Sequence, residues 1–415
     1  MKSDIPEGYK NSPVGVIPDE WEAKRLEEIA EIKSGTTPLR SIEDYFFKGN
    51  IPWVKTTDLN NGLLYETEEK VTQKALDETS LRILPKGTVL VAMYGGFNQI
   101  GRTALLTLDA TINQALSALL LNKTIADNLF ILYWLNHNVG SWKRYAASSR
   151  KDPNITSRDV ALFQTPLPPL NEQQKIAEIL SVWDVAIEKQ TLLIEKLELR
   201  KRALMQQLLT GKKRIKGFNG KVKKQQLKSY LLEISSRNSN NRINNVLSVT
   251  NSRGFISQSE QFERVVASED VSKYKIVRKG QFAYNPSRIN VGSLDMLKHV
   301  DCGILSPMYI VFETNKEHLN SNFLYYHLKS ENFTKRIPMY VQGSVRDSLS
   351  FDSLTAMKFY IPSLTEQIAI AEILSTADQG IHIAKEKLEQ FKKQKKGLMQ
   401  VLLTGKKRVI TTTNT

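Results

Sequence analysis

The chain contains one segment twice. Residues 168–214 and 362–408 align without a gap at an offset of 194 residues, with about half of the aligned positions identical. The first copy begins PPLNEQ, the second begins PSLTEQ, and both end in LLTGKKR. A long-period internal repeat constrains the architecture before any local pattern does, because both copies must fold alike. Two copies of one element predict a pseudo-two-fold molecule, which suits a partner that is itself two-fold or bipartite.

Each copy reads as one long helix. Asn171 and Thr365 are the predicted N-caps, since each follows a proline-containing extended stretch. Gly211 and Gly405 stand where a glycine ends a helix. About 39 helical residues would span roughly 58 Å at 1.5 Å per residue.

Apolar residues in both helices recur in alternating steps of four and three over more than four heptads. This spacing is typical of a coiled-coil seam, whereas a helix packed on a globular core would show a wider apolar stripe. We expect the two helices to pair antiparallel, with Gln190, Lys201 and Lys395 as polar seam residues that set the register. The apolar seam positions are Ile176, Leu180, Trp183, Ile187, Ile194, Leu197, Leu204 and Leu208 in the first copy and Ile370, Leu374, Ala377, Ile381, Ala384, Leu388, Phe391, Leu398 and Leu402 in the second.

The segments outside the repeats look rich in β-structure. Strand-like runs follow turn residues, and a short apolar helix precedes each repeat at nearly the same distance. The whole half therefore appears twice, and the mixed segments have diverged while the long helices have not. The expected strands are residues 51–54, 87–94, 280–284 and 308–312, and the expected short helices are residues 128–136 and 321–328.

These patterns predict an α+β fold with two mixed, β-rich domains and two long helices in an antiparallel coiled coil. The predicted parts are residues 1–167, the helical spacer 168–214, residues 215–361, the helical spacer 362–408 and a disordered tail, residues 409–415.

Composition favours a polyanionic partner. The 415 residues exceed one ordinary core, and 58 Lys and Arg against 43 Asp and Glu give a net charge of +15. Such a balance favours nucleic acid or an anionic membrane surface. A merely basic soluble protein stays open as the alternative. No apolar stretch is long enough to span a membrane and no signal peptide is visible, so we expect a soluble, cytoplasmic protein. Among two-fold or bipartite partners, which the repeat favours, double-stranded DNA is the commonest.

No catalytic or metal-binding motif is visible. The chain lacks a phosphate-binding loop, a glycine-rich cofactor loop and the Asn/Asp-Pro-Pro-Tyr cluster with which amino-methyltransferases hold a flipped base. The lone Cys302 excludes an intrachain disulfide, and the five histidines are scattered without partner cysteines. We expect no cofactor, no metal and no catalytic activity.

Polar, basic and glycine-containing loops interrupt the β-rich segments and predict DNA contacts. Arg can bond guanine in a bidentate manner and Asn or Gln can bond adenine, while Lys, Ser and Thr can hold phosphates. For each residue an ordinary solvated loop stays open as the alternative. The candidates in the first half are Lys33, Ser34, Thr36, Lys55, Thr56, Thr57, Tyr94, Asn98, Gln99, Arg102, Arg150 and Lys151. Those in the second half are Arg237, Asn238, Arg253, Asn285, Arg288, Asn290, Gln342, Ser344 and Arg346.

The segment 211–228 carries eight basic residues and no acidic one. It is either a flexible, solvated linker or a supporting phosphate contact.

The repeated PPLNEQ and PSLTEQ starts, the closing LLTGKKR and the two-halves layout resemble the specificity (S) subunit of type I restriction-modification systems. The stretches from Pro18 (PDEWE) and Ile51 (IPWVKTTDL) are also typical of that family. The resemblance implies two target recognition domains that each read half of a split, asymmetric DNA sequence, with conserved antiparallel helices between them. It also implies two methyltransferase (M) subunits, motor-nuclease (R) subunits in the full complex, and no catalysis by the chain itself. One departure is Lys221, near the place where the family often keeps a tryptophan like Trp21.

A stiff helical spacer would set the gap between the two half-sites. One heptad corresponds to ~10 Å, or about three base pairs. The exposed helix faces would then form the methyltransferase dock, with simple solvation as the alternative. The candidates are Glu172, Gln173, Glu178, Glu195, Glu366, Gln367, Glu372 and Glu389.

Other readings stay open. The chain could be the targeting subunit of a fused methyltransferase-nuclease system, or a regulator that binds a split operator alone. A third reading is a scaffold whose coiled coil organises proteins and whose charge is incidental.

Overall fold

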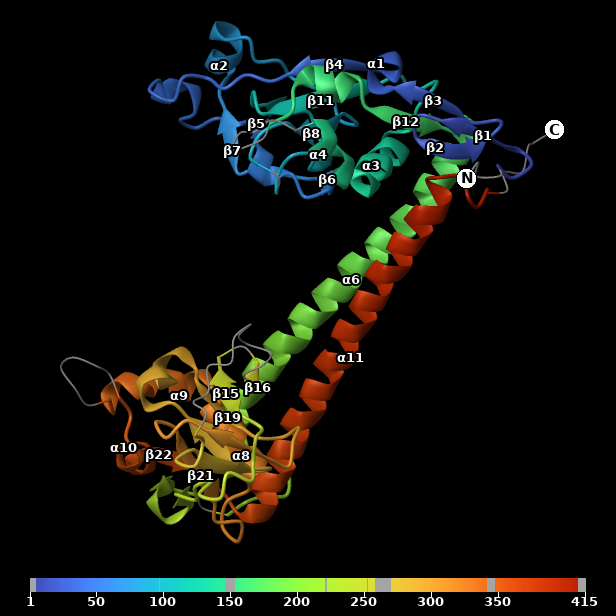
Figure 1. Ribbon diagram of the computed structural model, residues 1–415. Helices are drawn as coiled ribbons and strands as arrows, with labels where there is room; N and C mark the ends of the chain where they lie inside the picture. Colours follow the sequence, from blue (N-terminus) through green and yellow to red (C-terminus); the bar gives the residue numbers. More distant parts are fainter. Residues whose placement is uncertain are drawn as a thin grey trace. The chain divides into compact units, whose positions relative to one another are not determined.

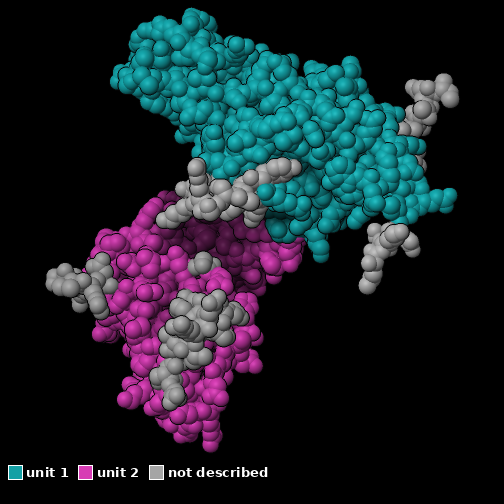
Figure 2. Space-filling model, turned by 45° about the horizontal axis from the view of Figure 1, so that its top comes forward, with its two compact units in different colours: residues 1–189, 387–415 teal, residues 190–386 magenta. Residues whose placement is uncertain are grey.

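The computed structural model describes residues 5–96, 98–145, 154–220, 222–251, 253–257, 270–341 and 348–409, apart from the side chains of Lys143 and Tyr145. The chain divides into two compact units (Figure 2), unit 1 with residues 1–189 and 387–415 and unit 2 with residues 190–386. The division passes through both long helices. Each unit therefore holds one mixed domain, the first half of one long helix and the second half of the other.

The two long helices are confirmed. Helix α6, Leu170–Leu208, and helix α11, Leu364–Leu402, each have 39 residues (Figure 1). Both begin before the predicted N-caps, so Asn171 and Thr365 lie in the first turn. Gly211 and Gly405 follow the helices with φ of 71° and 70°, a left-handed backbone that glycine adopts without strain.

The predicted antiparallel pairing of the helices is also confirmed within each unit. In unit 1 the rings of Trp183 and Phe391 meet edge to face at 5.8 Å. In unit 2 the buried Gln190 amide donates to the carbonyl oxygen of Ala384 at 2.9 Å. The first turns differ from a pure seam, because Ile176 and Ile370 are buried in the hydrophobic cores of their units.

A polar triad repeats at the seam. In unit 1 the Tyr133 hydroxyl donates to Asp184 at 2.6 Å, and Lys395 pairs with the other oxygen of the same carboxylate. Burial, followed by the hydrogen bond to Asp184, raises the pKa of Tyr133, so the phenol keeps the proton that it donates. The equivalent residues in unit 2 are Tyr326, Asp378 and Lys201.

A buried carboxylate lies at the start of each long helix. Glu172 accepts from Nε and Nη2 of Arg408 at 2.7 and 2.9 Å, and from the Trp21 indole at 3.1 Å. In unit 2, Glu366 accepts from Nε and Nη2 of Arg214, both at 2.6 Å. The arginine that closes one repeat therefore neutralises the glutamate that opens the other.

The two mixed domains share one sheet order. Unit 1 contains the order β4-β11-β8-β9-β6 and unit 2 the order β14-β21-β18-β19, and the three corresponding pairings in the two sheets are antiparallel. The strand pairs β3 with β12 and β13 with β22 correspond as well. The expected duplication of the whole half therefore extends to the sheets.

Unit 1 also contains a three-stranded sheet of order β10-β5-β7 and the pair of β1 with β2. Its strands are β1 Tyr9–Ser12, β2 Gly15–Pro18, β3 Glu22–Arg25, β4 Ala30–Ser34, β5 Ile51–Val54, β6 Gly62–Leu64, β7 Glu69–Val71, β8 Val89–Ala92, β9 Thr103–Leu106, β10 Thr111–Ile112, β11 Leu116–Leu121 and β12 Gln164–Leu167. Its short helices are α1 Leu26–Ile29, α2 Gln73–Glu78, α3 Asn128–His137, α4 Trp142–Tyr145 and α5 Ser157–Ala161.

Unit 2 adds two short strand pairs, β15 with β16 and β17 with β20, to its four-stranded sheet. Its strands are β13 Lys224–Gln226, β14 Leu231–Ile234, β15 Leu247–Thr250, β16 Gly254–Ser257, β17 Lys275–Arg278, β18 Phe282–Tyr284, β19 Leu294–Met296, β20 Cys302–Leu305, β21 Ile310–Thr314 and β22 Lys358–Tyr360. Its short helices are α8 Ser321–Leu328, α9 Glu331–Arg336 and α10 Phe351–Ala356. The basic segment 211–228 is thus not wholly a linker, because it contributes β13.

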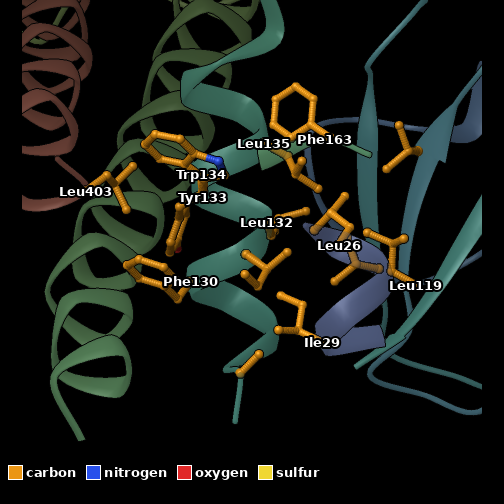
Figure 3. Close-up of a cluster of buried hydrophobic side chains, with 14 of the residues drawn as sticks. Leu26, Ile29, Leu119, Phe130, Leu132, Tyr133, Trp134, Leu135, Phe163 and Leu403 are labelled. Atoms are coloured by element: carbon orange, nitrogen blue, oxygen red, sulfur yellow. The ribbon is translucent and has the colours of Figure 1, made fainter. Parts of the chain in front are cut away.

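Residues 130–135 in the middle of helix α3 are apolar on every face and are all buried. Figure 3 shows Phe130, Tyr133 and Trp134 on its side toward the long helices, near Leu403. Leu132 lies on the opposite side, toward α1 and the sheet. Each such side chain contributes roughly 1.5–3 kcal/mol on burial. Helix α3 therefore fastens the long helices to the mixed domain, and α8 occupies the same place in unit 2.

Within the described ranges, no helix combines the length and the apolar character needed to cross a membrane.

Removal of the Glu172–Arg408 pair is expected to destabilise unit 1. Replacing Arg408 with Met (R408M) leaves a buried carboxylate with fewer donors, so the free energy of unfolding of unit 1 should fall by about 2 kcal/mol. Urea-dependent hydrogen exchange of strands β8 and β11 measures it. The matched control is K406M, whose exposed side chain lies two residues earlier. Equal stability of the two variants would contradict a structural role for this pair.

His327 on α8 predicts a pH dependence of unit 2. Burial lowers the pKa of His327 to about 3, against about 6.5 in an unfolded chain. Between these values only the unfolded chain takes up the proton, so this stability is complete above pH 6.5 and falls as the pH falls. The loss should approach about 1.4 kcal/mol per pH unit.

Hydrogen exchange of strands β18 and β21 between pH 7 and pH 5 measures this slope. The variant H327Q should flatten it, whereas H382Q, at an exposed histidine of α11, should not. A slope that H327Q leaves unchanged would assign the effect to other groups.

Candidate nucleic-acid interface

In unit 1, three loops leave the five-stranded sheet at the same end. Ser34, the last residue of β4, pairs with Ser117 in β11, which pairs with Val91 in β8, and Val91 pairs with Thr103 in β9. Since paired residues lie side by side, the segments 34–36, 93–102 and 113–115 share one end of the sheet. We call these segments the loop end of unit 1.

Many of the predicted DNA-contact residues of the first half gather at this loop end. Two backbone segments approach closely there, since a Cβ at Gly35 would lie 2.2 Å from the carbonyl oxygen of Ile112. Tyr94 exposes 40% of its surface, and Ser34 and Asn98 are also exposed. The predicted residues in or directly before these segments are Lys33, Ser34, Thr36, Tyr94, Asn98, Gln99 and Arg102.

Strand β5 brings a second polar segment to the same place. It runs parallel to β10, and the Asn113 amide donates to the carbonyl oxygen of Val54 at 3.0 Å. The Thr36 amide donates to the carbonyl oxygen of Ile112 at 3.0 Å. The segment after β4 therefore lies beside the end of β10. The predicted residues placed beside the loop end in this way are Lys55, Thr56 and Thr57.

Lys55 is engaged within the unit. Its Nζ lies 2.9 Å from Glu68 and 2.6 Å from Glu69, and the hydrogen bond to Glu69 is the main cause that raises the pKa of Lys55. Arg40 also donates to Glu69, at 2.5 Å, and lowers the pKa of that carboxyl. Lys55 is therefore a member of a charge network that orders the segment after β5, and less free to hold a phosphate.

The loop end also contains residues that sequence reasoning missed. The hydroxyl groups of Ser80 and Thr36 lie 2.7 Å apart, and the exposed Arg82 follows two residues later. No local signal marks them, because they stand more than forty residues from Thr36 in the sequence.

Unit 2 has a corresponding loop end. Ile234 at the end of β14 pairs with Val311, and Tyr284 at the end of β18 pairs with both Ile310 and Leu294. The segments 235–238, 285–293 and 306–309 therefore share one end of the sheet. The predicted residues in them are Arg237, Asn238, Asn285, Arg288 and Asn290.

The hairpin of β15 and β16 joins this loop end and adds Arg253. Ser293 Oγ donates to the carbonyl oxygen of Val249 at 2.7 Å. A Cβ at Gly292 would lie 2.4 Å from Oδ1 of Asn251, in the hairpin turn. Arg253 is exposed in the same turn.

Two of the predicted asparagines use their amides internally. Asn238 is 3% exposed, and its side chain bonds both the N–H and the carbonyl of Ile243. Asn285 is 8% exposed and caps the following turn by accepting from the Ser287 amide at 3.1 Å. Both shape the loops, whereas Arg237, Arg288 and Asn290 are exposed.

Five candidates lie outside the described residues. They are Arg150, Lys151, Gln342, Ser344 and Arg346.

Four of the predicted docking residues on the long helices are not on exposed faces, and that part of the expectation is wrong. Gln173 donates to the carbonyl oxygens of Ile125 and Pro168 at 2.9 and 2.8 Å, and accepts from the Asp127 amide. The two glutamines are buried because they join the helix starts to the mixed domains, and the two glutamates are buried where they pair with Arg408 and Arg214. The four are Glu172, Gln173, Glu366 and Gln367, exposed by 2%, 0%, 1% and 0%.

The other four predicted docking residues are exposed. Glu178 lies 2.7 Å from Lys175 and Glu389 lies 2.8 Å from Lys392, one helical turn away in each case. Such exposed ion pairs contribute little to the free energy of folding. The four are Glu178, Glu195, Glu372 and Glu389.

Apolar side chains outside the seam were missed. Val182 on α6 and Ile383 on α11 expose 64% and 63% of their surfaces. The sequence did contain a signal for them, because they are apolar residues at helix positions outside the heptad seam. We call this set the off-seam apolar residues: Val182, Val185, Leu192, Leu193, Leu199, Ile368, Ile373 and Ile383.

No group of three or more His, Cys, Asp or Glu side chains comes together as a metal site in the part of the chain that the structure describes.

The sequence is similar to those of known specificity subunits. The chain is 28% identical over 426 residues to the type I restriction enzyme MjaVIII specificity subunit of Methanocaldococcus jannaschii, which covers 95% of this chain and 94% of that protein. It is 30% identical to the MjaIX specificity subunit of the same organism, over 46% of this chain and 45% of that protein.

A solved structure shows the same fold. The type I restriction-modification S subunit from M. genitalium superposes with a TM-score of 0.57 at 17% sequence identity, over 92% of this chain and 96% of that one. The sequence profile of the type I restriction modification DNA specificity domain matches residues 18–199 and 267–393, one match in each half. The chain belongs to this type I restriction-modification DNA specificity family.

Proposed function

We propose that this chain is the DNA specificity subunit of a type I restriction-modification complex, in which each unit reads one half of a bipartite, asymmetric target. The observation that carries the proposal is the equivalence of the two loop ends. The same strand order presents polar loops at one sheet end in both units, while the residues in those loops differ. Two sites of equal geometry and unequal chemistry suit two different half-sites.

In this proposal the chain positions DNA and carries out no chemistry. Two methyltransferase subunits dock on the long helices and motor-nuclease subunits join for cleavage, in the cytoplasm where the DNA lies. The helices set the gap between the half-sites, since a stiff helix has a fixed rise per residue.

If unit 2 reads one half-site, substitutions at its loop end should weaken recognition of that half-site only. Arg253 and Arg288 are exposed at the loop end of unit 2, so R253Q/R288Q should remove charge-assisted contacts. Binding of the cognate duplex should weaken roughly 5- to 150-fold, as expected for contacts worth about 1–3 kcal/mol.

Genome-wide base-modification sequencing of host cells with the intact gene, without it, and with R253Q/R288Q measures the effect. Methylation at one split motif should vanish without the gene, and the variant should relax only one half of that motif. The control K279Q/K316Q removes two exposed lysines outside the loop end. Methylation that is indifferent to the gene would overturn the specificity role and favour a split-operator regulator.

The off-seam apolar residues predict the partner surface. Exposed apolar side chains on a charged helix suit a partner helix, and an aspartate there would be desolvated on docking. The variant V182D should weaken methyltransferase binding at least about ten-fold, an effect of roughly 1.4 kcal/mol.

Pull-down and titration with the purified methyltransferase subunit test this prediction. The control Q225D places the same charge at an exposed polar position of β13, outside the long helices. The variant E178Q tests the acidic alternative. If E178Q weakens binding and V182D does not, the dock is polar and the apolar assignment fails.

A further inference from the structure

Unit 2 contains a pocket that the DNA-reading role does not use. Its volume is about 990 Å³, and it lies between the second half of α6, the α8–α9 corner and strands β13 and β22. Ligand sites typically have volumes of about 300–1,000 Å³. The floor includes His327 and Phe359, and the wall on α6 includes Leu199 and Ala203.

The rim of this pocket is cationic. Seven Lys and Arg side chains line it against a single carboxylate, Glu331. In the described part of the chain, no carboxylate lies within ion-pair distance of Arg202, Lys212, Lys224 or Lys358. Unit 2 as a whole is the more basic one, with 29 Lys and Arg against 18 Asp and Glu, compared with 29 against 25 in unit 1. The pocket therefore suits an anion.

In unit 1 a larger side chain occupies the position equivalent to His327 of the pocket floor. Trp134 on α3 is equivalent to His327, because each directly follows the tyrosine of the seam triad. Its indole donates to the carbonyl oxygen of Gln164 at 2.9 Å, and Figure 3 shows it on the side of α3 toward the long helices. In unit 2 the smaller imidazole stands there, 4% exposed, with Nε2 lacking a hydrogen-bond partner among the described residues.

Two rim lysines are also specific to unit 2. The repeat offset and the matching strand pairs make Lys358 equivalent to Gln164 and Lys224 equivalent to Ala23. The second half thus combines a smaller floor residue with cations at two lining positions where unit 1 has none. By the same register, Lys24 and Arg25 of unit 1 correspond to Gln225 and Gln226, so the positive charge of this strand pair is moved to the pocket.

One arginine offers a fixed planar surface in the pocket. Arg336 donates to the carbonyl oxygen of Lys358 at 2.8 Å, and its guanidinium carbon lies 5.3 Å from the ring centre of Phe359 and 5.8 Å from that of Tyr340. A guanidinium held on aromatic rings can stack with a nucleobase.

We propose that this pocket binds a nucleotide, with phosphate at the cationic rim and the base at the floor formed by His327, Phe359 and Arg336. The nucleotide is either a free nucleoside phosphate or an unpaired nucleotide of a DNA strand, since both present the same chemistry. The pocket is lined by residues of unit 2 only, and Lys212 and Lys224 are the two lining residues that belong to the basic segment 211–228, for which a supporting phosphate contact is one of the two alternatives.

Calorimetric titration of the full chain with AMP, ATP, inorganic phosphate and a 12-nucleotide single strand tests the proposal. The variant K224A/K358Q installs the residues of unit 1 and should weaken nucleotide binding at least about ten-fold, because two charge-assisted contacts are lost. The matched control K228Q/K316Q removes two exposed lysines outside the pocket and should change the affinity less than two-fold. The variant H327W fills the floor and should abolish binding, with circular dichroism as the check on folding.

If AMP or ATP binds, and K224A/K358Q and H327W weaken that binding while K228Q/K316Q does not, the ligand is a free nucleotide. If only the single strand binds with the same pattern, the ligand is a nucleotide of DNA. The proposal is overturned if nothing binds saturably, if phosphate binds as tightly as AMP, or if both double variants lose affinity equally. Binding of the cognate duplex, measured separately, tells this failure apart from failure of the specificity role.

Discussion

Two buried carboxylates, Glu172 and Glu366, are the constraint on which the rest of the architecture depends. Each opens one long helix, and each is neutralised by the arginine that closes the other repeat. A buried carboxylate without its partner is strongly destabilising, so the repeats must run antiparallel, with the start of one beside the end of the other. The Asp184–Lys395 and Asp378–Lys201 pairs impose the same choice further along the seam. Within each unit, Gln173 or Gln367 then joins the helix start to its mixed domain through backbone carbonyls.

This shared scaffold explains why the two halves could diverge only in certain places. The strand order, the apolar helix before each repeat and the contacts at the helix starts are the same in both units, since a change there would expose a buried charge or an apolar surface. The exposed side chains of the loops at the sheet ends are not under this constraint. In the family to which the chain belongs, DNA specificity is the common property, and variable loops on an unvarying frame are a physical means of changing the recognised sequence.

The pocket of unit 2 is a divergence of another kind, because it lies on the frame itself. Exchange of a tryptophan for a histidine removes both volume and a satisfied hydrogen bond from the position that Trp134 fills in unit 1. The surrounding lysines then concentrate positive charge at the opening. A buried polar atom without a partner is expensive, and a ligand is one way in which such a site becomes favourable. The two units are thus alike in their frame and unlike in the side chains that line this position.

The sequence by itself determined both long helices, their antiparallel pairing, their ends at Gly211 and Gly405, and the short helices α3 and α8. The helices follow from local periodicity and from glycine stops, which are properties of neighbouring residues. Their pairing was inferred from the heptad seam that the ungapped repeat presents twice. Only the tertiary structure decided which loops meet. Thr36 lies beside Ser80, and the hairpin that carries Arg253 lies beside the segment after β18, through hydrogen bonds between residues far apart in the chain. It also decided that Glu172 and Gln173 are buried although their composition suggested an exposed face. Burial depends on what the rest of the chain places against a side chain, and no local pattern contains that information.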